Sequence, residues 1–356
     1  MDGRVFWGSG RQRLETAVIT TAALFLAALA FGVFVALNGL NPLEVYAVLY
    51  LGSFGTWLSI EATLTQAAPL MLTALCTAIP ARAGLLVIGG EGALVVGGVT
   101  SVLAGVALAQ APARGGTLAV FLAGALGGAL WVSFAGALKH WRGVNETIAT
   151  LLLNYIAIAI LNHLVSGPMR DFAVSLKPTS WSIPAAFMIG TIPGLRVHWG
   201  VVFGVLACVI AHLPLTQTTF GFSVAILGGN LRAAQMVGLP IGRLTLAACA
   251  LGGAAAGLAG AVEVVAVHGA ASSSLVAGFG YAGILVAFLA RQNPLAIILC
   301  AMLVGGISAS GGLLQRRFDM SDAVTQVFQG IIFLCVLASS TLSGRLRIPQ
   351  DKVGEA

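Results

Sequence analysis

The sequence predicts an all-α protein with about ten transmembrane helices. Of its 356 residues, 58% are hydrophobic and only 8% are charged, whereas soluble domains carry about 25% charged residues. The mean hydropathy is +0.98. Its apolar runs have the length of about 20 residues that a helix needs to cross a bilayer core of about 30 Å. The alternating pattern of an outer-membrane barrel is missing from the sequence, so we expect a polytopic helical protein.

Ten apolar runs give the predicted spans in chain order: about 17–37, 57–79, 84–108, 117–138, 146–165, 198–215, 244–266, 275–290, 294–313 and 322–342. The first follows a basic segment but is about twice as long as the apolar part of a signal peptide, so we expect a retained helix. Glycines interrupt the third and the eighth run. Paired interruptions of this kind indicate an internal repeat of the sort found in transporters.

The basic residues set the predicted orientation. An even number of spans places both termini on one side, and with a cytoplasmic N-terminus twelve of the 18 Lys and Arg lie inside and six outside. The positive-inside rule therefore predicts cytoplasmic N- and C-termini. Arg316 and Arg317 fall outside, which makes the predicted 311–321 loop the weakest part of this topology. The charges form no basic stripe, which argues against nucleic-acid binding.

We expect one transmembrane domain over residues 1–356, with a cytoplasmic N-terminal segment at 1–16 and a cytoplasmic tail at 343–356. The Pro-rich segment 166–197 is predicted to be a structured extracytoplasmic loop. The inner segment 216–243 is predicted to hold a short helix between Gly and Pro turns. Pairs of glycines four residues apart, at 124 and 128 and at 253 and 257, favour tight helix packing over dimer contacts.

The sequence lacks the motifs of several common enzyme and metal-binding classes. No GxxxxGK[ST] loop occurs, so any ATP hydrolysis must come from a partner. The five His and five Cys residues have no metal-ligand or CxxC spacing, so we predict neither a metal site nor disulfides. A GxSxG elbow is also missing. The chain is therefore predicted to be no enzyme and to bind no cofactor itself.

Glu91 is the best-placed acidic residue, within Gly89-Gly90-Glu91-Gly92. Three glycines are predicted to loosen a helix in the middle of a span and to expose backbone groups to a polar solute. A carboxylate at that depth is costly and is often functional. The alternative is that Glu91 accepts hydrogen bonds from neighbouring backbone and only pins the bend, and both explanations stay open.

Other polar residues near the spans have simpler explanations. Glu61 and Glu263 are expected at solvated span ends, and Glu146 is expected to act only at a helix N-terminus, where a carboxylate is favourable. Asn154 lies about two turns into its span. There it either bonds across helices or lines a pore.

Three segments together resemble a known family: 84–98, 144–157, and 228–240 followed by 251–263. Residues 280–287 and the Asn293-Pro294 step add to the likeness, which covers about 60–340. The chain is similar to permease subunits of bacterial ABC importers for nucleosides and simple sugars, in the branched-chain-amino-acid and ribose-type permease superfamily. The 145–155 segment looks most like the nucleoside branch, which works with a basic-membrane-protein type lipoprotein.

The resemblance implies a permease in the bacterial cytoplasmic (inner) membrane that forms a path with a second, non-identical permease. ATP-binding subunits, which carry ATP and Mg, would power it, and an extracytoplasmic substrate-binding protein would deliver the solute. The family usually has Asn and Gln where this chain has Val87 and Ala93, which leaves the substrate open. The candidate residues of the substrate path are Gly89, Gly90, Glu91, Gly92, Asn154, Gly280, Tyr281 and Gly283.

The family's cytoplasmic GxNxxAAxxxG loop, which couples to the ATPase, matches residues 228–238. Ala233 and Ala234 are expected to give a slim helix that enters a groove, and Gly238-Leu239-Pro240 is expected to end it. The candidate coupling residues are Gly228, Asn230, Arg232, Ala233, Ala234 and Gly238.

The function that we predict is a nucleoside permease of an ABC importer. A simple-sugar permease for pentoses or hexoses is the first alternative. The second is an ion-coupled secondary carrier that uses Glu91 or Glu263 as a proton site. The third is a membrane scaffold that transports nothing.

Overall fold

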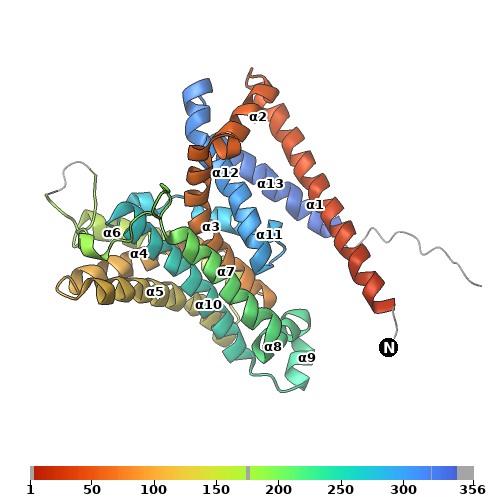
Figure 1. Ribbon diagram of the computed structural model, residues 1–356. Helices are drawn as coiled ribbons and strands as arrows, with labels where there is room; N and C mark the ends of the chain where they lie inside the picture. The colour runs from red at the N-terminus through yellow and green to blue at the C-terminus, as the bar shows by residue number, and fades with distance from the viewer. Residues whose placement is uncertain (1–3, 174–176, 322, 343–356) are drawn as a thin grey trace, which may run out of the picture. The chain divides into compact units, whose positions relative to one another are not determined.

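The computed structural model describes residues 4–173, 177–321 and 323–342, and most of these residues are helical. The predicted tail 343–356 and residues 1–3 lie outside the described residues. The α-helices, labelled in Figure 1 where there is room, are α1 (Arg4–Leu37), α2 (Pro42–Tyr50), α3 (Trp57–Arg82), α4 (Gly90–Ala107), α5 (Ala113–Arg142), α6 (Glu146–Ser166), α7 (Gly200–Gln217), α8 (Thr219–Gly229), α9 (Leu231–Met236), α10 (Ile241–Val262), α11 (Phe279–Leu289), α12 (Pro294–Phe318) and α13 (Ala323–Leu342).

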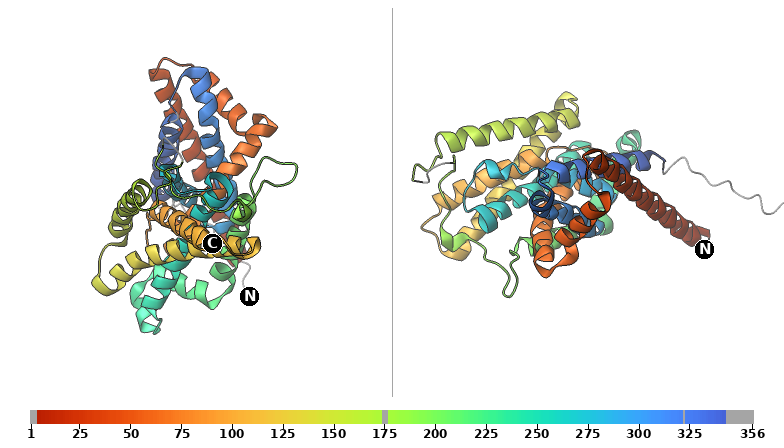
Figure 2. Two further views of the ribbon diagram at one scale, coloured as in Figure 1. Left: turned by 90° about the vertical axis from the view of Figure 1, so that its left-hand side faces the viewer. Right: turned by 90° about the horizontal axis from the view of Figure 1, so that it is seen from above.

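The helices form two compact units, residues 1–50 with 310–356 and residues 51–309. In the first unit, which we call the terminal unit, α1 and α13 lie side by side (Figure 1 and Figure 2). The rings of Phe31 and Phe328 stack there with centroids 4.3 Å apart. The terminal unit therefore has an apolar core of its own, to which α2 also contributes.

In the second or central unit, α10 packs closely against α5 and α4. A Cβ added at Gly257 would lie 2.1 Å from the carbonyl oxygen of Gly124, and one at Gly128 would lie 2.3 Å from that of Gly253. The two glycine pairs singled out in the sequence thus face each other within the chain. This is the tight helix packing that their spacing favours.

Every predicted span coincides with a helix, but three boundaries were wrong. The third span begins at Gly90 rather than 84, because Gly84 has a φ of +74° and residues 83–89 leave the helix. The eighth is short, Phe279–Leu289. The predicted 311–321 loop is helical up to Phe318, and the positive φ of 54° at Asp319 follows that end.

Eight of the helices in the described residues are long and apolar enough to cross a membrane, and 219–229, 273–289 and 323–339 are shorter apolar helical stretches. The chain is therefore an all-α, polytopic membrane protein. Helix α2 was not predicted, since nine residues are too few for a span. The orientation of the termini stays a prediction.

The segment 166–197 is ordered where it is described, although it holds no long helix. Its backbone N–H groups at Ser180 and Ile183 donate to the carbonyls of Ala271 and Gly269, at 2.9 and 2.8 Å. Phe187 is buried against Gly116 of α5. The segment therefore covers the start of α5 and residues 269–271, which follow α10 and its π-helical extension Glu263–His268. Its extracytoplasmic side remains a prediction.

Candidate functional site

The connection between α3 and α4 is an interrupted membrane helix. Residues 83–89 have backbone groups without helical partners, and in an apolar environment such groups must be bonded elsewhere. Helix α6 supplies the partners. The Oγ1 of Thr150 accepts the N–H of Ile88 at 3.1 Å, while Asn154 accepts the N–H of Gly92 at 2.8 Å and donates to the Ile88 carbonyl at 2.9 Å.

Glu146 extends this row of partners and does more than sit at a helix N-terminus. Its Oε1 accepts the N–H of Leu86 at 3.4 Å, and its Oε2 pairs with Nζ of Lys139 at 2.5 Å. Asn145 supplies the N-cap of α6 instead, since its side chain accepts from the next turn. Glu146, Thr150 and Asn154 are spaced four residues apart, so they lie on one face of α6. Of the two explanations for Asn154, the structure shows the bond across helices.

Glu91 bridges two interrupted helices. It lies in the first turn of α4 and is completely buried. Its Oε1 accepts the N–H of Gly278 at 2.9 Å and its Oε2 accepts that of Gly280 at 2.6 Å, at the start of α11. One carboxylate therefore serves two helix N-termini, where negative charge is favourable. The predicted mid-span bend was wrong, because the helix begins at this point.

Glycines let α4 and α11 approach each other. A Cβ on Gly280 would lie 2.1 Å from the backbone nitrogen of Glu91, and one on Gly90 would lie 3.5 Å from the Cα of Gly280. Gly283 packs in the same way against Thr73 of α3, whose hydroxyl donates to the carbonyl of Phe279 at 2.9 Å. Gly280 and Gly283 therefore need a residue without a side chain, whereas a Cβ on Gly90 would make only an ordinary van der Waals contact.

The predicted path residues therefore gather in one place. We call Gly89, Gly90, Glu91, Gly92, Asn154, Gly280 and Gly283, with Thr73 and Thr150, the Glu91 cluster. All of its residues are buried, and Tyr281 beside it is 40% exposed. Both carboxylate oxygens of Glu91 are occupied by backbone donors. A direct contact between these residues and a solute stays a prediction.

Sequence reasoning missed the two threonines of this cluster. The spacing of 146, 150 and 154 was visible and would have placed Thr150 on the face of Asn154. Thr73 gave no such signal, because its partner Phe279 lies 206 positions further along the chain.

Glu61 and Glu263 are not at solvated ends, contrary to expectation. Each residue is only 6% exposed. The Oε1 of Glu61 accepts the backbone N–H of Arg196 at 3.2 Å, and a carboxylate oxygen of Glu263 lies 3.6 Å from Nε2 of His268. The N–H of Ile189, in the segment 166–197, donates to the carbonyl of Val265 in the π-helical stretch Glu263–His268 that follows α10, which explains why Glu263 is covered.

The predicted coupling segment forms a short, well-capped helix, α9. The side chain of Asn230 accepts the N–H groups of Arg232 and Ala233 at 2.9 and 3.2 Å. At the other end Gly238 has a φ of +75°, and Leu239 donates to the carbonyl of Ala234 at 3.0 Å. This is a Schellman C-cap, which requires the left-handed conformation that Gly adopts readily.

Helix α9 presents large apolar side chains to its surroundings. Leu231 is 52% exposed, Met236 82% and Val237 70%, while Ala234 is fully buried. Ala234 therefore packs against its own chain, and the entry of the slim helix into a groove of a partner stays a prediction. Gly228 also packs against its own chain, since a Cβ there would lie 2.2 Å from the carbonyl oxygen of Arg82.

One apolar cluster connects α9 with the interrupted helix. Ala234 of α9 and Leu227 of α8 belong to the same buried cluster as Val87 of the connection and Ala93 of α4. Val87 and Ala93 are the positions where the similar family usually carries Asn and Gln. Here they are part of the packing that links the exposed helix to the Glu91 cluster.

Comparisons with known proteins agree on one family. The model of the branched-chain amino acid transport system permease component matches residues 59–337. The chain is 30% identical over 331 residues to the guanosine ABC transporter permease of Bacillus subtilis, covering 92% of this chain and 95% of that one. It is 29% identical over 332 residues to the glucose ABC transporter permease of Haloferax volcanii, covering 90% and 87%. It is 27% identical over 304 residues to the nucleoside ABC transporter permease of Lactococcus lactis, covering 83% and 84%.

Proposed function

The chain belongs to the family of branched-chain amino acid transport system permease components, and on this premise we propose that it forms the path for nucleosides through the cytoplasmic membrane in an ABC importer. The observation that carries the proposal is the similarity to permeases named for guanosine and nucleosides over at least four fifths of the chain. A glucose permease at 29% identity supports a simple sugar as the second candidate cargo.

The proposed motor is a separate ATP-binding subunit that docks on α9. The sequence has no phosphate-binding loop of its own. The exposed Leu231, Met236 and Val237 lie on a segment that the charge pattern assigns to the cytoplasm, where apolar side chains in this number favour a protein contact. Arg232 is exposed beside them and has no ion pair among the described residues. We therefore assign the docking contact to these side chains rather than to the alanines.

The proposed coupling runs through packing. A shift of α9 would disturb the cluster of Ala234, Val87 and Ala93, which underlies the start of α4. Close-packed interiors transmit such strain instead of absorbing it. The Glu91 contact with Gly278 and Gly280 would then be the element that holds or releases α11. A second permease and an extracytoplasmic substrate-binding protein complete the proposed importer.

The geometry of Glu91 does not favour the ion-coupled carrier. A proton site needs a carboxylate that exchanges with water in at least one state. Both oxygens of Glu91 accept backbone N–H groups at 2.9 and 2.6 Å, and the residue is completely buried. Family membership supports ATP as the energy source.

The proposal is tested by uptake of labelled guanosine, uridine and glucose in cells of the source organism with and without this chain. We expect loss of nucleoside uptake on deletion, restored by the intact chain. Uptake of glucose alone would select the second candidate. Nucleoside uptake that collapses with an uncoupler at constant ATP would contradict an ABC importer and favour the carrier.

A further inference from the structure

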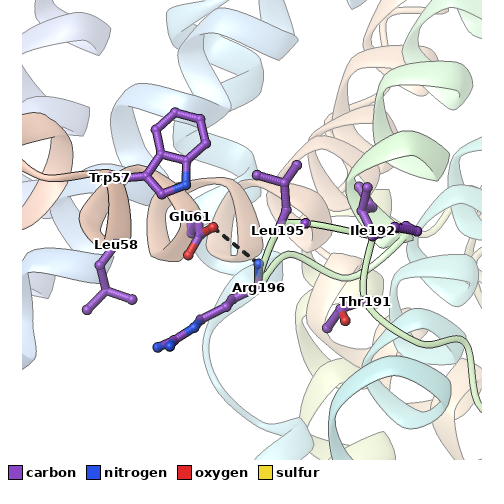
Figure 3. A pocket seen from close by; sticks show the side chains of 9 residues that line it. Trp57, Leu58, Glu61, Thr191, Ile192, Leu195 and Arg196 are labelled. Atoms are coloured by element: carbon purple, nitrogen blue, oxygen red, sulfur yellow. Dashed lines mark hydrogen bonds between the residues drawn. The ribbon is translucent and has the colours of Figure 1, made fainter.

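A pocket outside the Glu91 cluster lies between the first turns of α3 and residues 191–196 (Figure 3). Its volume is about 670 Å³, within the range of about 300–1,000 Å³ usual for small-molecule sites. The predicted topology places this end of α3 on the extracytoplasmic side. The pocket is therefore open to solutes before they reach the path.

The pocket contains one carboxylate with unused bonding capacity. Glu61 is only 6% exposed, and its Oε1 accepts the backbone N–H of Arg196 at 3.2 Å. Figure 3 shows the Arg196 side chain extending away from this carboxylate. Among the ion pairs of the described residues none involves Glu61. A buried carboxylate in this state is stabilised by any donor group that enters the pocket.

An aromatic ring stands beside the carboxylate. Trp57 is 65% exposed, and in Figure 3 its indole lies next to Glu61 at the pocket. Indole faces stack on planar groups, including nucleobases. The combination suits a flat ligand whose edge carries two parallel N–H donors, because a carboxylate accepts such a fork with both oxygens.

We propose that this pocket is an outer reception site for guanine nucleosides, an inference that rests on the proposed nucleoside cargo. Guanine carries N1–H and the 2-amino group side by side on one edge. On the same edge, adenine, cytosine and uracil each carry an acceptor next to their donor. That acceptor would face a carboxylate oxygen, which is also an acceptor, and would be repelled. The guanine edge pairs with Glu61 while the base stacks on Trp57.

The test is equilibrium dialysis of radiolabelled guanosine, inosine, adenosine and uridine against the purified full chain. We expect guanosine to bind at least about tenfold more tightly than the others, a factor that corresponds to one additional hydrogen bond. Glu61→Gln presents an amide N–H₂ to the donors and is expected to abolish this preference. Trp57→Ala, at an exposed position, is expected to weaken guanosine about tenfold through lost stacking.

Arg196→Ala is the matched control. It keeps the backbone N–H that holds Glu61 and removes only a guanidinium, so guanosine affinity is expected to stay the same or to rise. Thermal melting checks that each variant is folded. If Glu61→Gln does not fold, Trp57→Ala still tests the proposal. Equal binding of all four nucleosides, or guanosine binding that survives both variants, overturns the proposal.

A guanidinium carries the same donor fork, so Nα-acetylarginine amide serves as the second probe. Binding of this compound without guanosine would overturn the nucleoside site and assign the pocket to an arginine of a protein partner. The uptake experiment separates the two proposals. If the intact chain restores guanosine uptake but dialysis finds no binding that depends on Glu61, only the reception site fails.

Discussion

The Glu91 cluster and helix α9 solve the same problem in opposite settings. In each, a side chain satisfies the free N–H groups at the start of a helix. Asn230 accepts from residues two and three positions further on, whereas Glu91 accepts from residues 187 and 189 positions away. The first is a local cap that folds with its helix, and the second exists only when the central unit is assembled.

The two regions also differ in whether their side chains have partners within the chain. The Glu91 cluster is buried and its polar side chains are paired within the chain. Helix α9 has its backbone capped at both ends and keeps its large apolar side chains exposed. The contrast teaches that the cluster holds helices of the central unit together, while α9 exposes the apolar side chains on which we propose that the motor subunit docks.

The largest effect on stability is expected from Gly280→Val in the cluster. Its Cβ would lie 2.1 Å from the backbone nitrogen of Glu91, so the helices must separate at a cost of about 3 kcal/mol or more. We expect a much lower melting temperature and little folded protein. Gly229→Ala, next to α9, meets nothing within 4 Å and serves as the control. Equal melting of the two variants would refute the close contact.

Glu91→Gln should have the next largest effect. The amide offers one acceptor where the carboxylate offers two, so one buried N–H loses its partner at a cost of about 1–3 kcal/mol. Hydrogen exchange at Gly278 and Gly280 should accelerate, and uptake should fall. Glu44→Gln, an exposed position on α2, is the control. Unchanged exchange at both glycines would mean that the bridge is not formed in the membrane.

Asn230→Ala is expected to cost about 1 kcal/mol, the usual value of an N-cap. The loss should be confined to α9 and seen as faster hydrogen exchange at residues 231–236, with the global melting temperature almost unchanged. Asn230→Asp keeps the accepting oxygen and should behave like the parent chain. A global loss of stability from the alanine variant would break the distinction between a local and a long-range cap.

Met236→Glu should have the smallest effect on stability and a large effect on transport. The side chain is 82% exposed, so we expect a change within about 0.5 kcal/mol, together with loss of ATP-driven uptake if Met236 anchors the motor. Ala234→Glu, two residues earlier but fully buried, should instead reduce the amount of folded protein. Full uptake by the Met236 variant would remove α9 as the docking element.

How much of the site could be predicted from the sequence depended on distance along the chain. The short helix and its stop at Gly238 were predicted from neighbouring residues, and the cap at Asn230, although not predicted, also depends only on residues two and three positions further on in the helix. The partners of Glu91 could not be predicted in this way, because no residue near Glu91 in the sequence indicates that it bonds to Gly278 and Gly280. The burial of Glu61 was missed for the same reason, since the covering residue is Arg196.

The sequence by itself determined that the chain is helical and membrane-embedded, where its spans approximately lie, which family it resembles and which segment is similar to that family's coupling loop. Each of these depends on composition or on residues within one helix, where hydrophobicity and hydrogen bonding are local. Only the tertiary structure decided that Glu91 joins α4 to α11, that Ala234 faces inward and that Glu61 opens onto a pocket. These depend on which distant backbone groups packing brings together, and buried polar groups in a membrane protein must be paired by such long-range contacts.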